Sequence, residues 1–162
     1  MLDEGFMPLR VLIVEDNLDW EEVWKLVLHV FAEESEIFWA TSVVEAKQLL
    51  SEKASNGFRF DIVICDIFLS GSLTGFDFFE YVDDQYKDSF IFVSSVKPNK
   101  VRASVNAVGH DVRVLQKPFR MKDAITELRA IQRKSSFRPE QLIQSRASFG
   151  PNLGGGHERQ EP

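Results

Sequence analysis

Five polar side chains in this 162-residue chain each follow a short apolar segment, at places where side chains of these types could act together. They comprise three carboxylates, a hydroxyl and an ammonium: Glu15, Asp16, Asp66, Ser94 and Lys117. Carboxylates that share a cleft repel one another, and a hard cation such as Mg²⁺ relieves this repulsion through oxygen ligands. Such a cation also binds phosphoryl oxygens, and an ammonium and a hydroxyl can hydrogen-bond other oxygens of the same group. The set therefore predicts Mg²⁺-dependent phosphoryl chemistry, with Asp66 as the nucleophile.

Two kinds of segment alternate before these residues and predict the elements that position them. Short apolar, β-branched runs predict strands, and they occupy residues 9–14, 37–39, 62–65, 90–93 and 112–115. Apolar residues at helical spacing, capping residues or a first-turn proline predict helices, and these cover residues 18–31, 42–50, 75–82, 98 to near 109, and 121–134. Five β-α units predict an α/β fold with a doubly wound, five-stranded parallel sheet. Sites in such sheets lie beyond the carboxyl ends of the strands.

Net charge and the lengths of the apolar runs exclude several classes of protein. The net charge of −6 argues against nucleic-acid binding, which needs clustered basic residues. No apolar run is long enough for a membrane span, and the acidic N-terminus does not resemble a signal peptide, so we expect a cytoplasmic protein. Residues 1–134 carry the whole net charge and form the predicted domain. The glycine- and proline-rich residues 135–162 predict a mostly disordered C-terminal tail.

Four separated motifs lie at the ends of the first, third, fourth and fifth predicted strands: Leu12-Ile-Val-Glu-Asp-Asn17, Ile62-Val-Ile-Cys-Asp66, Ile91-Phe-Val-Ser-Ser95 and Leu115-Gln-Lys-Pro-Phe119. Over about residues 8–130 the chain resembles the receiver domain of two-component response regulators. The resemblance implies a flavodoxin-like (βα)5 fold with strand order 2-1-3-4-5, which places Asp16 beside Asp66. It also implies a stand-alone phosphoacceptor of a two-component system or phosphorelay.

The resemblance also implies a role for each site residue. Asp66 is the expected phosphoacceptor and a Mg²⁺ ligand. Asp16 is expected to bind the ion directly, Glu15 to help through water, and the backbone carbonyl of Phe68 to complete the metal site. Phosphoryl transfer from a histidine kinase or phosphotransfer protein would then switch the binding of a downstream protein or of a second copy.

At the ends of the fourth and fifth strands the resemblance implies the remaining parts of the switch. Ser94 matches the switch hydroxyl, and Lys117 matches the phosphate-binding lysine. The bond between Lys117 and Pro118 is a candidate for the cis form, which is common only before proline.

The chain also departs from the family pattern. Ser70 replaces a proline and Gly75 lies one position late, so we expect a mobile loop after Asp66. Val114 replaces an aromatic switch residue. Phe68 and Val96 flank the expected path of hydrolytic water and offer no polar group, which predicts a long-lived acyl phosphate.

Two other functions compete with a phosphoacceptor switch. An aspartate-nucleophile phosphatase would carry Asp-x-Asp on its first strand, whereas Asp66-Ile-Phe68 lies on the third and lacks the second aspartate. A degenerate receiver, acting as a phosphorylation-independent interaction module, is the main alternative because of Val114 and the altered loop. We expect no enzyme activity beyond the chain's own phosphorylation and slow dephosphorylation.

Overall fold

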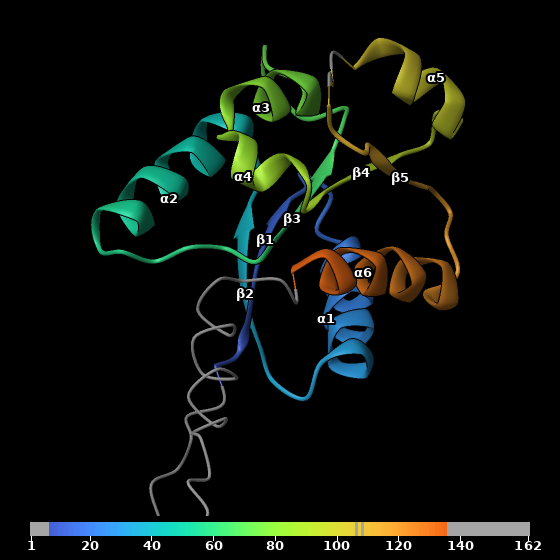
Figure 1. Ribbon diagram of the computed structural model, residues 1–162. Coiled ribbons are helices and arrows are strands. Elements are labelled where there is room, and N and C mark those ends of the chain that lie inside the picture. The colour runs from blue at the N-terminus through green and yellow to red at the C-terminus, as the bar shows by residue number, and fades with distance from the viewer. Residues whose placement is uncertain (1–6, 106, 108, 136–162) are drawn as a thin grey trace, which may run out of the picture. The chain divides into compact units, whose positions relative to one another are not determined.

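The computed structural model describes residues 7–105, 107 and 109–135. Strands and helices alternate along the chain, as Figure 1 shows. The strands are β1 (Leu9–Val14), β2 (Ser35–Ala40), β3 (Ile62–Asp66), β4 (Phe90–Ser94) and β5 (Arg113–Gln116). The helices are α1 (Trp20–Phe31), α2 (Val43–Ser55), α3 (Gly75–Tyr81), α4 (Asp84–Lys87), α5 (Pro98–Ser104) and α6 (Met121–Ser135).

The five strands form one parallel sheet in the order β2-β1-β3-β4-β5. This order confirms the predicted doubly wound topology, and it reverses between β1 and β3. Val14 of β1 pairs with Ala40 of β2 on one side and with Cys65 of β3 on the other. The residues that follow β1 and end β3 therefore reach the same edge of the sheet at the same level.

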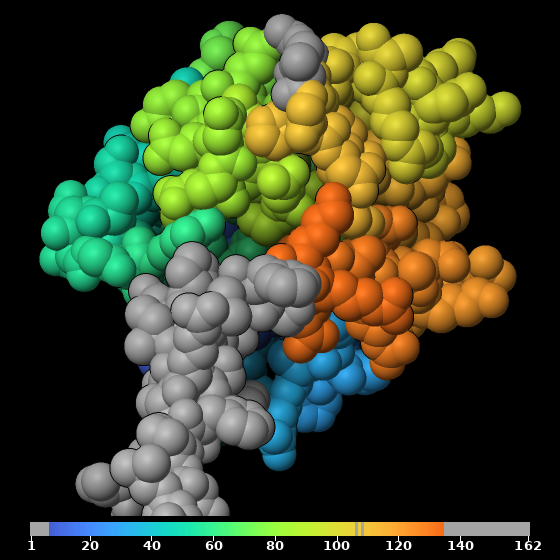
Figure 2. Space-filling model, viewed as in Figure 1, coloured from blue at the N-terminus to red at the C-terminus, as the bar shows by residue number. Residues whose placement is uncertain are grey.

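Each face of the sheet is covered by its own helices, because alternate residues of a strand point to opposite faces. On β1, Leu12 and Val14 belong to the core beneath α2, α3, α4 and α5, whereas Val11 and Ile13 belong to the core beneath α1 and α6. Figure 2 shows α1 (blue) close to α6 (orange), and α2 (teal) and α3 (green) grouped elsewhere. Both faces are buried, which explains the continuous apolar runs of the central strands β3 and β4.

The helix boundaries differ from the predicted ones at three places. The short helix α4 was not predicted; its four residues carry too few apolar positions for a helical pattern. Helix α5 ends at Ser104, well before Gly109. Helix α2 continues to Ser55, beyond the predicted end at residue 50. Ser42 caps its start by accepting a hydrogen bond from the backbone N–H of Glu45, and the Glu45 carboxylate accepts hydrogen bonds from Thr41.

The compact unit that carries the sheet ends at Ile131, inside α6. The predicted C-terminal tail lies outside the described residues from position 136 onward, so its predicted disorder stays a prediction. Within the described part of the chain, every helix is too short or too polar to cross a lipid bilayer.

Candidate phosphoacceptor site

Three carboxylates meet at the sheet edge where the strand order reverses. Glu15 and Asp16 directly follow β1, and Asp66 is the last residue of β3. One oxygen from each of the three lies within 4.8 Å of the others. Glu15 and Asp66 are buried, at 2% and 9% exposure, whereas Asp16 is exposed to solvent. The arrangement gathers carboxylate oxygens of the type that divalent cations take as ligands, and solvent can reach the one on Asp16.

The ammonium of Lys117 joins the two buried carboxylates. Its Nζ donates to Oε2 of Glu15 at 2.5 Å and to Oδ2 of Asp66 at 2.7 Å. Burial lowers the pKa of Lys117, but the hydrogen bonds to Asp66 and Glu15 outweigh this effect and raise its pKa overall. Burial raises the pKa of Glu15 above its usual value, even though the bond to Lys117 opposes that shift. One positive charge thus faces two desolvated carboxylates.

Ser94 ends β4 and is fully buried beside this group. Its Oγ accepts a hydrogen bond from the backbone N–H of Val96 at 3.1 Å. Its carbonyl accepts from the backbone N–H of Lys117 at 2.8 Å, which ties the end of β4 to the lysine. The peptide bond between Lys117 and Pro118 is cis, as predicted.

The backbone after Asp66 turns around the carboxylate. The N–H of Phe68 donates to Oδ1 of Asp66 at 3.1 Å, while Phe68 as a residue is 61% exposed. The backbone of Phe68 therefore lies at the site. The role of its carbonyl as a metal ligand stays a prediction.

The loop between β3 and α3 makes a contact that the sequence analysis missed. The backbone N–H of Ser70 donates to Oδ2 of Asp16 at 2.9 Å. Proline has no N–H, so the presence of Ser70 where the family has proline is the signal in the sequence for this bond. The loop is thereby bonded to an expected metal ligand.

Gly75 closes this loop against the site. Its N–H donates to the carbonyl of Ile67 at 2.8 Å. A Cβ at this position would lie 2.3 Å from the carbonyl oxygen of Asp66 and 2.9 Å from Cα of Ile67. Only glycine allows α3 to begin this close to the end of β3. Thr74 and Asp77 then cap the helix through reciprocal hydrogen bonds.

Comparison with known proteins agrees with this geometry. The family model of the response regulator receiver domain matches residues 11–129. The chain belongs to this family. No sequence among the curated proteins matches the chain.

Solved receiver structures share the fold. The chemotaxis protein CheY4 of Vibrio cholerae is 26% identical, with a TM-score of 0.59 over 77% of this chain and 99% of that one. The non-phosphorylated receiver domain of HemR from Leptospira biflexa is 28% identical, with a TM-score of 0.56 over 77% and 94%. The signal receiver domain of an HD domain-containing protein from Pseudomonas fluorescens is 19% identical, with a TM-score of 0.63 over 83% and 96%.

Two tryptophans of this receiver contact the site, and the sequence analysis assigned neither of them to it. Nε1 of Trp39 donates to the carbonyl of Glu15 at 3.0 Å. The ring of Trp20 lies over Nζ of Lys117, 4.8 Å from the ring centroid. Trp20 is one of the apolar residues at helical spacing within 18–31, and this spacing carries no information about a contact with a lysine about a hundred residues away.

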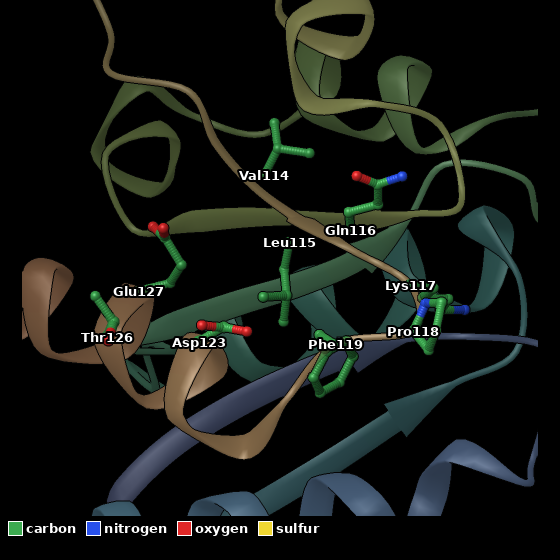
Figure 3. Close-up of a pocket in the computed structure, with 9 residues that line it drawn as sticks. All are labelled: Val114, Leu115, Gln116, Lys117, Pro118, Phe119, Asp123, Thr126 and Glu127. Carbon is green, nitrogen blue, oxygen red and sulfur yellow. The ribbon is translucent and has the colours of Figure 1, made fainter.

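A cavity of about 440 Å³ adjoins the site between β5 and α6 (Figure 3). Lys117 lies at one end of it, but the three carboxylates do not line it. Val114, which replaces the family's aromatic residue, is buried and lines this cavity. The remaining lining residues are Leu115, Gln116, Pro118, Phe119, Asp123, Thr126 and Glu127.

Proposed function

We propose that this receiver accepts a phosphoryl group on Asp66 from a histidine kinase or phosphotransfer protein. Modification would then alter binding to a downstream protein or to a second copy of the chain. The observation that carries the proposal is the meeting of Glu15, Asp16, Asp66 and Lys117 at the carboxyl edge of the sheet. These residues come from three strand ends, and the receiver topology brings them together.

The residues present fit a Mg²⁺ ion. The three carboxylate oxygens within 4.8 Å of one another are of the hard type that Mg²⁺ prefers. Lys117 is the ammonium hydrogen-bonded to this group, so the carboxylates keep a net negative charge. When bound, Mg²⁺ would offset this charge and stabilise the negative charge that develops on a transferring phosphoryl group.

The chain's own residues supply the nucleophile and its surroundings. In the proposed reaction, an oxygen of Asp66 forms a bond to phosphorus. The bond from phosphorus to the donor breaks, and its electron pair stays on the leaving group. Lys117 already donates to Oδ2 of Asp66, so its ammonium can pair with a phosphoryl oxygen once the carboxylate is esterified. Ser94 is the proposed donor to a second phosphoryl oxygen.

Intact-mass measurement tests the proposal directly. With Mg²⁺ and acetyl phosphate, we expect an adduct of ~80 Da, the mass of one phosphoryl group. Asp66→Asn should abolish it while the fold is retained, as checked by circular dichroism. Asp19→Asn removes an exposed carboxylate in the loop between β1 and α1 and should leave the adduct unchanged.

The competing function is a receiver that binds partners without phosphorylation. It is favoured by Val114, because this small side chain occupies the position of the family's switch aromatic. If the wild-type chain stays unmodified with every small donor and with histidine-phosphorylated proteins, this alternative replaces our proposal.

A further inference from the structure

The indole of Trp20 contacts the reactive centre, yet the phosphoryl transfer proposed above does not use it. Trp20 is the first residue of α1 and is half-buried. Its ring centroid lies 4.8 Å from Nζ of Lys117. A cation within about 6 Å of a ring centroid is attracted by the negative face of the ring, most strongly when the ring is that of tryptophan.

The contact completes the surroundings of the Lys117 ammonium. An ammonium has three N–H donors. Two of them are directed to Glu15 and Asp66, which lie in the acidic group. The Lys117 side chain is only 14% exposed, so little water reaches the remaining side of the ammonium. The face of Trp20 lies close to that charge and offers it a third favourable partner.

The indole of Trp20 also packs against a second aromatic ring, besides its contact with Lys117 described above. Its ring stacks on Phe119, with centroids 5.1 Å apart and an angle of 28° between the planes. Phe119 follows Lys117 by two residues and also contacts Trp24, which is buried in the core of α1. Trp20 therefore contacts the segment after β5 at both its lysine and its phenylalanine.

We propose that Trp20 is a positioning residue for Lys117, an inference that rests on the proposed function. The ring face keeps the ammonium directed at Asp66 while its hydrogen-bond partner changes from a carboxylate oxygen to a phosphoryl oxygen. A ring face suits this change because its attraction for a cation is spread over an area, whereas a hydrogen bond has one preferred direction. As the O–P bond to Asp66 forms, the donor's bond to phosphorus breaks and its electron pair leaves with acetate or with the donor's imidazole nitrogen.

The test compares side chains that keep or remove the π face at position 20. Trp20→Leu should slow the modification of Asp66 by acetyl phosphate about tenfold, the rate factor expected when a partly desolvated cation–π contact is lost. Trp20→Phe keeps a ring and should recover most of the rate. Trp20→Met is a second aliphatic variant, for use if the leucine variant does not fold.

A matched control removes a similar contact elsewhere. Lys47 lies over the ring of Tyr81 at 4.4 Å, on α2 and α3 and outside the acidic group. Tyr81→Leu should leave the rate of modification unchanged. Wild-type rates in Trp20→Leu and Trp20→Met, or equally slow Trp20→Phe and Trp20→Leu variants, would overturn the proposed role of the ring face.

A second measurement needs neither donor nor metal. Protons on Cε of Lys117 should show an upfield ring-current shift in the NMR spectrum of the metal-free protein, and Trp20→Leu should remove it. Absence of this shift from the wild-type spectrum would contradict the placement of the ammonium over the ring. An inert wild-type chain that retains the shift would instead overturn the proposed phosphoacceptor function.

Discussion

Lys117 is shared between two buried carboxylates that would otherwise repel each other. Its Nζ lies 2.5 Å from Glu15 and 2.7 Å from Asp66, and both carboxylates are almost fully buried. A buried charge that loses its partner is strongly destabilising, whereas an exposed ion pair contributes little. The lysine that pairs with the phosphoryl group in our proposal is therefore also a residue on which the stability of the unmodified site depends.

We predict that Lys117→Met lowers the free energy of unfolding by about 3 kcal/mol at neutral pH, because two desolvated carboxylates lose their shared cation. Added Mg²⁺ should recover part of the loss, since an ion that binds only the folded state stabilises it. Urea denaturation with and without MgCl₂ measures both effects. Lys25→Met is the control: Lys25 forms exposed pairs with Glu21 and Glu22, and its loss should cost less than about 1 kcal/mol. A Lys117→Met chain as stable as wild type would contradict the prediction.

The acyl phosphate should be long-lived because its neighbours cannot direct water. Phe68 presents an exposed ring, and Val96 presents only methyl groups. Phe68→Asn adds an amide that can orient a water molecule, so we predict that it shortens the phosphoprotein lifetime about tenfold. Intact-mass decay after donor removal measures the lifetime. Leu26→Asn is a control at a similarly exposed apolar position on α1. A wild-type half-life of seconds without a phosphatase would show that water reaches the site unaided.

Gly75 is required because of packing, not because of its dihedral angles. We predict that Gly75→Ala lowers the free energy of unfolding by about 3 kcal/mol, since backbone atoms of Asp66 and Ile67 cannot move away from the added methyl group. Gly57→Ala is the comparison: its φ is +70° but nothing lies within 4 Å, so it should cost only about 1 kcal/mol. Urea denaturation of both variants tests the order. A more harmful change at Gly57 would contradict it.

At the scale of elements, α3 is anchored to the site through its first turn. Gly75 bonds the carbonyl of Ile67, and the Thr74–Asp77 capping box satisfies N–H groups that a helix start leaves unpaired. Ser70, earlier in the same loop, bonds Asp16. The loop that the sequence predicted to be mobile thus has hydrogen bonds at both of its ends.

The capping box gives a prediction about pH. The backbone N–H of Thr74 donates to Asp77, and this bond lowers the pKa of the carboxyl. A carboxyl whose pKa is lower when folded contributes stability above its unfolded pKa and loses it as pH falls through the folded value. Wild type should therefore be more stable than Asp77→Asn at neutral pH. The difference should begin to shrink below about pH 4, near the pKa of an unfolded aspartate, and should disappear only below the lowered pKa of the folded protein. Urea denaturation at a series of pH values tests this. Asp83→Asn, at a helix start without a side-chain cap bond, should show no comparable trend.

At the scale of the whole molecule, the sheet divides the core into two separate parts. Leu50 of α2 belongs to the first part and Ile91 of β4 to the second. The two parts are separate because neighbouring residues of each strand point to opposite faces of the sheet. The rings of Phe79 and Phe92, in contrast, lie 5.3 Å apart within the first core. Substitutions should therefore be independent across the sheet and coupled within one face.

We predict that Leu50→Ala and Ile91→Val reduce the free energy of unfolding additively, to within about 0.5 kcal/mol. Phe79→Leu and Phe92→Leu should deviate from additivity by more than that, since each ring fills space beside the other. Double-mutant cycles by urea denaturation provide both comparisons. Strong coupling across the sheet with none between the two rings would contradict the division of the core.

Much of this molecule follows from its sequence. Continuous apolar runs identify the strands, because both faces of a parallel sheet are covered. Residues placed directly after those runs necessarily reach one edge, so Glu15, Asp16, Asp66 and Lys117 could be expected to meet. The cis bond before Pro118 followed from the family resemblance and is present. The boundaries of α4 and α5 were not predictable, since short helices contain too few residues to establish a period.

Two contacts at the site depend on how the chain folds: the amide of Ser70 donates to Asp16, and the ring of Trp20 lies over Lys117. Neither contact follows from residue type or spacing. A backbone N–H is common to nearly all residues, and a tryptophan at helical spacing is equally suited to any core. The partners are chosen by the path of the folded chain, which brings a loop and a helix start to the same strand ends. Residue types and their order along the chain thus identify the candidate groups for the proposed chemistry, and the path of the folded chain selects the neighbours that hold them in place.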